Sequence, residues 1–222
     1  HHLGYAPGEA QLLKIQDVLT PASLQVATQV IAEDMALVGN GAGAPRKSRS
    51  LELEYTRKDG STVWGEVNTR FLKNEEGEIS GILGITRDIT DRKKSEQDLL
   101  FMAYHDSLTG LYNRKAFIEL LDNEIKYAQR YQSGLALLFF DLNRFKQVND
   151  TYGHGVGDQL LKGVAERLKA AVRESDIIFR LGGDEFTIIL KTPEVIFPEV
   201  VVRRIQDNLA EPFFFKSIQI GF

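Results

Sequence analysis

The sequence predicts a two-part protein of mixed α+β and α/β class, with an antiparallel sheet followed by alternating helices and strands. Three segments within 51–89 alternate apolar and polar residues and are separated by turn sequences. A polar segment with helical spacing follows at 91–106, and helical and strand patterns alternate after it. We therefore expect a first domain over 1–90, a linking helix over 91–106 and a second domain over 107–222.

Composition limits the function classes. Of the 222 residues, 43% are apolar and 26% charged, and the net charge is −4, which disfavours nonspecific binding to nucleic acid or anionic membrane. There is no Cys, which excludes disulfides, thiolate metal sites and Cys nucleophiles and fits a reducing compartment. No run approaches the ~20 apolar residues of a membrane span. We expect a cytoplasmic protein, and a membrane anchor further upstream in a longer chain stays open.

The first domain has the pattern of an antiparallel meander. Residues 5–38 are typical of loop and short helices, and strands are expected over 51–58, 61–72 and 79–89. Asp59-Gly60 is a hairpin turn signal between the first two strands. This part shows little sign of catalytic residues.

The linking helix is polar, with Thr90 as its expected N-cap. Its apolar positions are few, near 99, 102 and 103. A dimeric coiled coil and a solvated linker helix both remain open for it.

The second domain alternates helix and strand. Asn113 is the expected N-cap of its first helix, and the apolar run LALLFF indicates a central buried strand. The expected elements are helices over 114–132, 158–173 and 198–209, strands from 135–140 and over 213–222, and a hairpin over 177–190.

Two carboxylates of this domain fall where a ligand is expected. Asp141 ends the apolar strand, and Asp184 lies at the tip of the hairpin, which we expect in the same sheet. Neighbouring strands lie ~4.8 Å apart, so both carboxylates can reach one cation. Oxygen ligands suit Mg²⁺. The alternatives are a solvated turn for the tip and a helix cap for Asp141.

Residue types that suit a nucleotide ligand occur near these positions in the sequence. Gly182 and Gly183 permit a tight turn and close approach of a phosphate, and Lys146 and Arg180 supply positive charge. Separately, the side chains of Asn149 and Asp158 suit hydrogen bonds to a base edge.

Taken together, three motifs carry a resemblance. RLGGDEF (180–186), DLNRFKQVNDTYGHGVGDQLL (141–161) and HDSLTGLYNR (105–114) resemble the GGDEF domain, the diguanylate cyclase family, whose fold is a palm-like central sheet flanked by helices. The match covers about residues 100–222. The upstream meander and GITRDITDRK (84–93) are similar to the C-terminal part of a PAS domain.

The resemblance implies that two GTP molecules are condensed into cyclic di-GMP with release of two pyrophosphates, in a homodimer that uses Mg²⁺ or Mn²⁺. It implies Asp141 and Asp184 as metal carboxylates, assisted by the Leu142 carbonyl, and Glu185 as a second-metal ligand or proton acceptor. The remaining implied contacts are guanine recognition by Asn149 and Asp158, and phosphate binding by Lys146, Arg180 and backbone amides near Phe145 and Gly183.

A regulatory site is also implied. Arg173 and Asp176 match the R-x-x-D pattern of product inhibition by cyclic di-GMP, with Arg204 as a contributor from the next helix. The alternative for Arg173, which we weigh below the inhibitory site, is a solvated residue favoured near a helix C-terminus.

The sequence departs from the family pattern in two places. Asn143 stands where the family often has a second Asp. The first PAS strands and the last strand, helix and phosphate-contacting Lys of the GGDEF domain are expected to lie outside this sequence.

For the PAS part the resemblance leaves the ligand unknown. Residues 1–90 contain no Cys that could form a flavin adduct, and no His other than residues 1 and 2 that could bind haem, so we predict neither cofactor. The leading function is a PAS-regulated diguanylate cyclase. The alternative is an inactive receptor that binds cyclic di-GMP or GTP and signals through partner proteins. A nucleic-acid polymerase palm also uses two carboxylates, but the small size and acidic charge of this chain argue against that function. We therefore predict no nucleic-acid partner.

Overall fold

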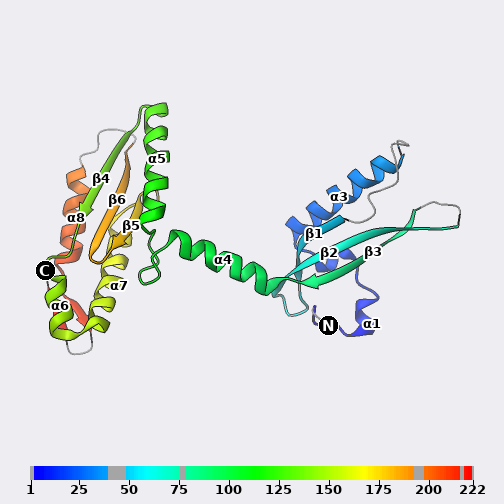
Figure 1. Ribbon diagram of the computed structural model, residues 1–222, viewed down its shortest axis with the longest axis horizontal. Coiled ribbons are helices and arrows are strands. Elements are labelled where there is room, and N and C mark those ends of the chain that lie inside the picture. The colour runs from blue at the N-terminus through cyan, green and yellow to red at the C-terminus, as the bar shows by residue number, and fades with distance from the viewer. Residues whose placement is uncertain (1–2, 40–48, 76–78, 193–197, 216–217, 222) are drawn as a thin grey trace. The chain divides into compact units, whose positions relative to one another are not determined.

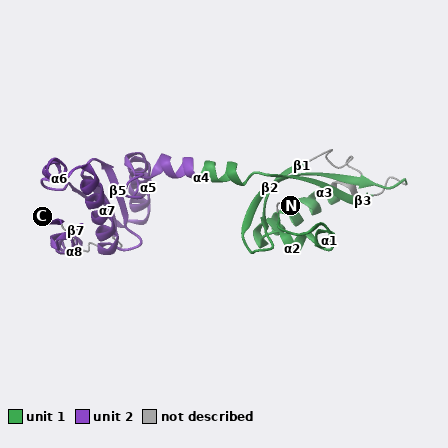
Figure 2. Ribbon diagram, turned by 90° about the horizontal axis from the view of Figure 1, so that it is seen from below, with its two compact units in different colours: residues 1–97 green, residues 98–222 purple. Residues whose placement is uncertain are grey.

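The computed structural model describes residues 3–39, 49–75, 79–192, 198–215 and 218–221. The chain divides into two compact units, residues 1–97 and 98–222 (Figure 2). Both units mix helices with antiparallel sheet, which confirms the predicted fold class.

The first unit is a three-stranded antiparallel sheet with helices before it (Figure 1). Strands β1 (Arg49–Thr56), β2 (Thr62–Lys73) and β3 (Ile79–Asp88) lie in the order β1-β2-β3. Helices α1 (Pro7–Ala10), α2 (Ile15–Val18) and α3 (Pro21–Gly39) precede them. The unit's core joins Leu19 and Ala27 to Leu53 and Val67 of the sheet.

Helix α3 corrects the expectation of only short helices before residue 38. Its buried positions Ser23, Ala27, Val30 and Asp34 recur at helical spacing, but two of the four are polar, so the apolar pattern is interrupted. Both polar side chains have partners on β1. The Ser23 hydroxyl accepts the Glu54 N–H at 2.8 Å, and Asp34 pairs with Arg49 at 3.3 Å.

Helix α4 (Thr90–Tyr104) is the expected linking helix. Thr90, expected as the N-cap, is instead the first helical residue: its hydroxyl accepts the Trp64 N–H of β2 at 3.0 Å, and its own N–H donates to Asp88 at 2.9 Å. None of its residues is buried within the structure, so coiled coil and solvated linker both stay open.

The second unit is built around the three-stranded antiparallel sheet β4-β6-β5. Helix α5 packs on one face, and α6, α7 and α8 contribute to the core on the other (Figure 1). Asn113 caps α5, accepting the Ala116 N–H at 3.0 Å as predicted. In chain order the elements are α5 (Arg114–Tyr131), β4 (Gly134–Phe140), α6 (Phe145–Tyr152), α7 (His154–Ala171), β5 (Ile177–Gly182), β6 (Glu185–Thr192), α8 (Pro198–Ala210), β7 (Phe213–Phe215) and β8 (Ile218–Ile220).

Three details differ from the sequence analysis. Among the described strands β6, not β4, is central, and Phe139 on β4 is exposed. The described residues of 213–222 form two short antiparallel strands, β7 and β8, instead of one strand. Residues 145–152 form helix α6, which was not predicted because its apolar positions are too few to show periodicity. Within the described ranges, no helix is both long and apolar enough to cross a membrane.

Candidate functional site

The predicted carboxylates meet at one end of the sheet. Phe140, the last residue of β4, pairs with Phe186 of β6, so Asp141 follows at the end that carries Asp184 and Glu185. Among the described residues none of these three carboxylates has a hydrogen bond or ion pair with another side chain. Their oxygen atoms are available to a ligand.

The turn that carries Asp184 depends on its glycines. Gly182 pairs with Glu185, which leaves Gly183 and Asp184 as a two-residue connection between β5 and β6. Gly182 has φ +148° and Gly183 φ +53°, conformations that residues with a Cβ rarely adopt. A Cβ at either position would meet no atom within 4 Å, so their requirement is backbone conformation and not space.

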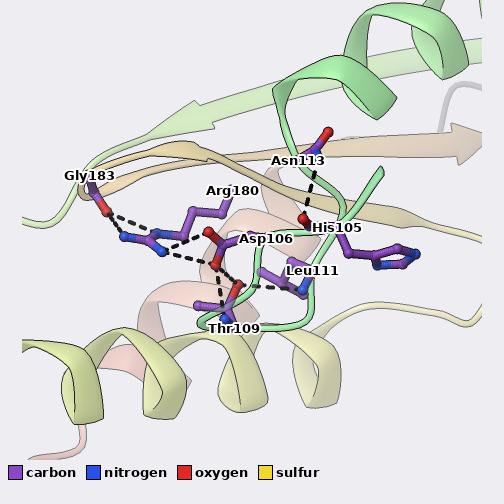
Figure 3. Close-up of polar contacts among 7 residues, drawn as sticks. All are labelled: His105, Asp106, Thr109, Leu111, Asn113, Arg180 and Gly183. Atoms are coloured by element: carbon purple, nitrogen blue, oxygen red, sulfur yellow. Dashed lines mark hydrogen bonds and ion pairs between the residues drawn. The ribbon is translucent and has the colours of Figure 1, made fainter. Parts of the chain in front are cut away.

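An ion pair anchors this turn (Figure 3). Arg180 Nη1 donates to both carboxylate oxygens of Asp106, at 2.9 and 3.0 Å. Its Nε and Nη2 donate to the Gly183 carbonyl at 2.9 and 2.7 Å. We call Asp106, Arg180 and Gly183 the hairpin clamp.

The clamp carboxylate is itself held by its own loop. Asp106 accepts the backbone N–H of Thr109 at 2.9 Å and its hydroxyl at 2.6 Å. Burial opposes the ionisation of Asp106, but the hydrogen bonds from Thr109 and Arg180 outweigh it and hold the pKa of its carboxyl below the ordinary value. Asp106 is therefore the charged partner of Arg180 at neutral pH.

The clamp changes the interpretation of Arg180, which the sequence analysis expected to contact phosphate. Its side chain is 11% exposed, and its guanidinium already bonds Asp106 and the Gly183 carbonyl. These contacts favour a positioning role for Arg180. No role was expected for Asp106 or Thr109. The signal that could have revealed them is the D-x-x-T spacing, since it suits a carboxylate that accepts hydrogen bonds from the residue three positions on.

Of the two residues expected to recognise guanine, Asn149 on α6 lies close to the start of α7, which carries Asp158. The Asn149 side chain packs against Gly157, the residue before Asp158. The contact is so close that a Cβ at Gly157 would lie 2.0 Å from Asn149 Oδ1 and 3.3 Å from the Phe145 ring. Gly157 is buried, whereas Asp158 is exposed. The close approach therefore requires glycine at 157.

The remaining expected substrate contacts lie at the start of α6. Lys146 is exposed in its first turn. The Phe145 N–H donates to the Leu142 carbonyl at 3.2 Å, so the two backbone groups expected to bind phosphate and metal are paired in this structure.

A cation is compatible with the site through its chemistry. The described residues contain no group of three or more His, Asp or Glu side chains that could hold a metal ion by themselves. Mg²⁺ commonly takes one or two carboxylates together with substrate phosphates, and the unpartnered Asp141 and Asp184 supply such a pair.

The expected regulatory residues lie at the opposite end of β5. The Asp176 carboxylate accepts the Arg173 N–H at 2.9 Å and the Lys191 N–H at 3.3 Å. Arg173 is exposed just after α7, and Arg204 is exposed on α8. The structure places Arg173 and Asp176 together, and shows no contact between either of them and Arg204 among the described residues.

Comparison with known proteins gives two family matches. Residues 103–221 match the family model described as diguanylate cyclase, GGDEF domain, and residues 3–91 match that of the PAS domain.

The names of similar proteins refer to the synthesis or breakdown of cyclic di-GMP. The chain is 36% identical over 159 residues to the diguanylate cyclase DgcM of Escherichia coli K12, covering 67% of this chain and 36% of DgcM. It is 40% identical over 150 residues to the cyclic di-GMP phosphodiesterase NbdA of Pseudomonas aeruginosa, covering 68% of this chain and 18% of NbdA. The chain thus spans a minor part of each relative.

Among solved structures, the coiled coil and GGDEF domain of DgcB from Caulobacter crescentus, in complex with cyclic di-GMP, is similar with a TM-score of 0.54 and 25% identity. The similarity covers 60% of this chain and 70% of that one.

Proposed function

The chain belongs to the GGDEF-domain family, and we propose that it is a diguanylate cyclase that condenses two GTP molecules into cyclic di-GMP and two pyrophosphates. The observation that carries the proposal is the intact Gly182–Glu185 turn beside Asp141, with three carboxylates that have no protein partner among the described residues. Carboxylates left unpaired at one sheet end suit a ligand that brings its own positive charge.

The proposed reaction is an in-line displacement. The 3′-oxygen of one GTP forms a bond to the α-phosphorus of the other, the bond to the β-phosphate oxygen breaks, and pyrophosphate leaves. Two such steps close the ring. Bound Mg²⁺ or Mn²⁺ would neutralise charge on the phosphates. Asp141 and Asp184 would hold the cation at the phosphates, and Glu185 would accept the proton of the attacking hydroxyl or help to bind a second cation.

Positioning accounts for most of the remaining catalysis in phosphoryl transfer. Asn149 and Asp158 bind the guanine edge, Lys146 and the backbone amides near Phe145 contact phosphates, and the hairpin clamp keeps Asp184 at the sheet end. Because one such site holds one GTP, the reaction needs two copies that face each other, and we propose a homodimer.

Regulation completes the proposal. Residues 1–90 would respond to an unidentified PAS ligand or signal, and residues 91–106 would transmit the response to the GGDEF domain. Thr90 supports this route, since it bonds β2 at the point where α4 begins. Arg173 and Asp176 would bind cyclic di-GMP as an inhibitor, with Arg204 as a further contributor.

Incubation with GTP and Mg²⁺, followed by chromatography of the products, tests the activity. Cyclic di-GMP and pyrophosphate are expected for the wild type and absent for Asp184→Ala. Full turnover by Asp184→Ala would refute the role of the tip.

A second candidate is a receptor without turnover. The similarity to NbdA favours it, because a chain named for phosphodiesterase activity shares this region. Tight binding of cyclic di-GMP without formation of any product would identify the receptor.

A further inference from the structure

A pocket of about 420 Å³ lies beside the proposed regulatory residues. One wall comes from the C-terminal half of α5, with Tyr127 and Tyr131, and the other from Arg173 and Ser175 before β5. Its volume is in the range of small-molecule sites. The site assigned from the sequence contains only the second wall.

The tyrosines of the first wall are unusually open. Tyr127 is 56% exposed and Tyr131 60% exposed, and their ring centroids are 4.5 Å apart with an interplanar angle of 41°. Neither belongs to the apolar cluster that α5 forms with the sheet. Two large aromatic rings that contribute nothing to that core leave ring faces available for stacking.

Of the two cationic side chains that line the pocket, Arg173 is the better candidate to bind an anion. Lys191 is paired with Glu124 at 2.6 Å, which neutralises its charge. The Arg173 guanidinium has no partner among the described residues, while the Arg173 N–H is held by Asp176 at 2.9 Å. Asp176 therefore orders the turn that presents Arg173, and Arg173 is the cation of the pocket that has no partner within the described part of the chain.

We propose that Tyr127 and Tyr131 are the base-stacking wall of this nucleotide site. This inference rests on the proposed product inhibition at Arg173. A purine base of cyclic di-GMP stacks on the tyrosine rings while a phosphate bonds the Arg173 guanidinium, because bases stack on aromatic side chains and guanidinium binds phosphate in a bidentate geometry. Besides the ligand contact proposed for it above, Asp176 positions Arg173 through its hydrogen bond to the Arg173 N–H.

Calorimetric titration with cyclic di-GMP tests the assignment in the whole chain. Tyr127→Ala and Tyr131→Ala should each weaken binding roughly 10-fold, within the range measured for loss of one base–aromatic stack. Tyr127→Phe and Tyr131→Phe keep the ring face and should bind within about 2-fold of wild type. Ile118→Ala, on the same helix at a residue 62% exposed and outside the pocket, is the matched control.

The outcomes separate this inference from the proposed function. If Arg173→Ala loses binding and both alanine variants keep the wild-type affinity, the stacking wall is wrong and the regulatory site stands. If neither Arg173→Ala nor the tyrosine variants change the affinity, the ligand binds elsewhere and both assignments fail. A change of sedimentation with unchanged nucleotide affinity would make the tyrosines a contact between copies and would overturn the wall. Turnover of GTP, measured separately, tests the cyclase itself.

Discussion

Asp184 and Asp106 both lie beside the β5–β6 hairpin, yet their surroundings are opposite. Asp184 has no partner among the described residues, whereas Asp106 is bonded to Thr109 and Arg180. The clamp satisfies its charges within the protein and so can stabilise the hairpin. The tip leaves its charges without a protein partner among the described residues, which suits the ligand-binding role proposed for it and adds little to stability.

The largest effect is expected at the tip. Asp184→Ala should lower turnover at least ~100-fold, because charge neutralisation at the transferred phosphate contributes several kcal/mol. Thermal unfolding should stay near the wild-type value. Initial rates with GTP and Mg²⁺ measure the first effect, with Asp207→Ala on the exposed side of α8 as control. Equal losses of activity and stability would remove the distinction between tip and clamp.

The clamp should show the reverse, mainly a loss of local stability. Arg180→Ala leaves the Asp106 carboxylate without its charged partner, which costs about 2 kcal/mol. Amide exchange in the hairpin should then be roughly 30-fold faster. Lys169→Ala, which removes an exposed pair with Glu166, should change exchange little. Unchanged hairpin protection in Arg180→Ala would argue that the clamp holds nothing.

A substitution at Gly157 tests the proposed recognition of guanine by Asn149. In Gly157→Ala the new Cβ would lie 2.0 Å from Asn149 Oδ1, so the Asn149 side chain must move. We expect KM for GTP to rise about 10-fold, the loss of roughly one good hydrogen bond to the base, with a smaller change in kcat.

Gly155→Ala is the matched control, since on the same helix its Cβ would meet nothing within 4 Å. Steady-state kinetics that are the same for both variants would exclude Asn149 from guanine recognition.

The smallest effect is the dependence on acid. The pKa of Asp106 is lowered in the folded state, so its stabilisation is complete above the unfolded value of about 3.9 and is lost as pH falls through the lower, folded value. Thermal midpoints of the wild type and Asp106→Asn should differ by a constant amount near neutral pH and converge below about pH 4. A difference that persists unchanged into that range would mean that Asp106 is not the titrating group.

Much of the fold was predictable because its signals are local. Asn113 caps α5, and the Asp59-Gly60 turn separates β1 from β2, since both are determined by neighbouring residues. Helices α3 and α6 were harder. Ser23 and Asp34 interrupt the buried face of α3, and their partners on β1 are distant in the chain.

For the candidate site too, part was predictable from local sequence and part depends on the tertiary structure. The residue types and spacings of 141–161 and 180–186 by themselves predicted a nucleotide site, because carboxylates bind cations, glycines allow a tight turn and amides bond base edges. Only the tertiary structure decided that Arg180 bonds Asp106, 74 residues away in the chain, and that Tyr127 faces the pocket of Arg173. Such contacts depend on how β5 packs between the loop before α5 and α5 itself, and no local pattern encodes that packing.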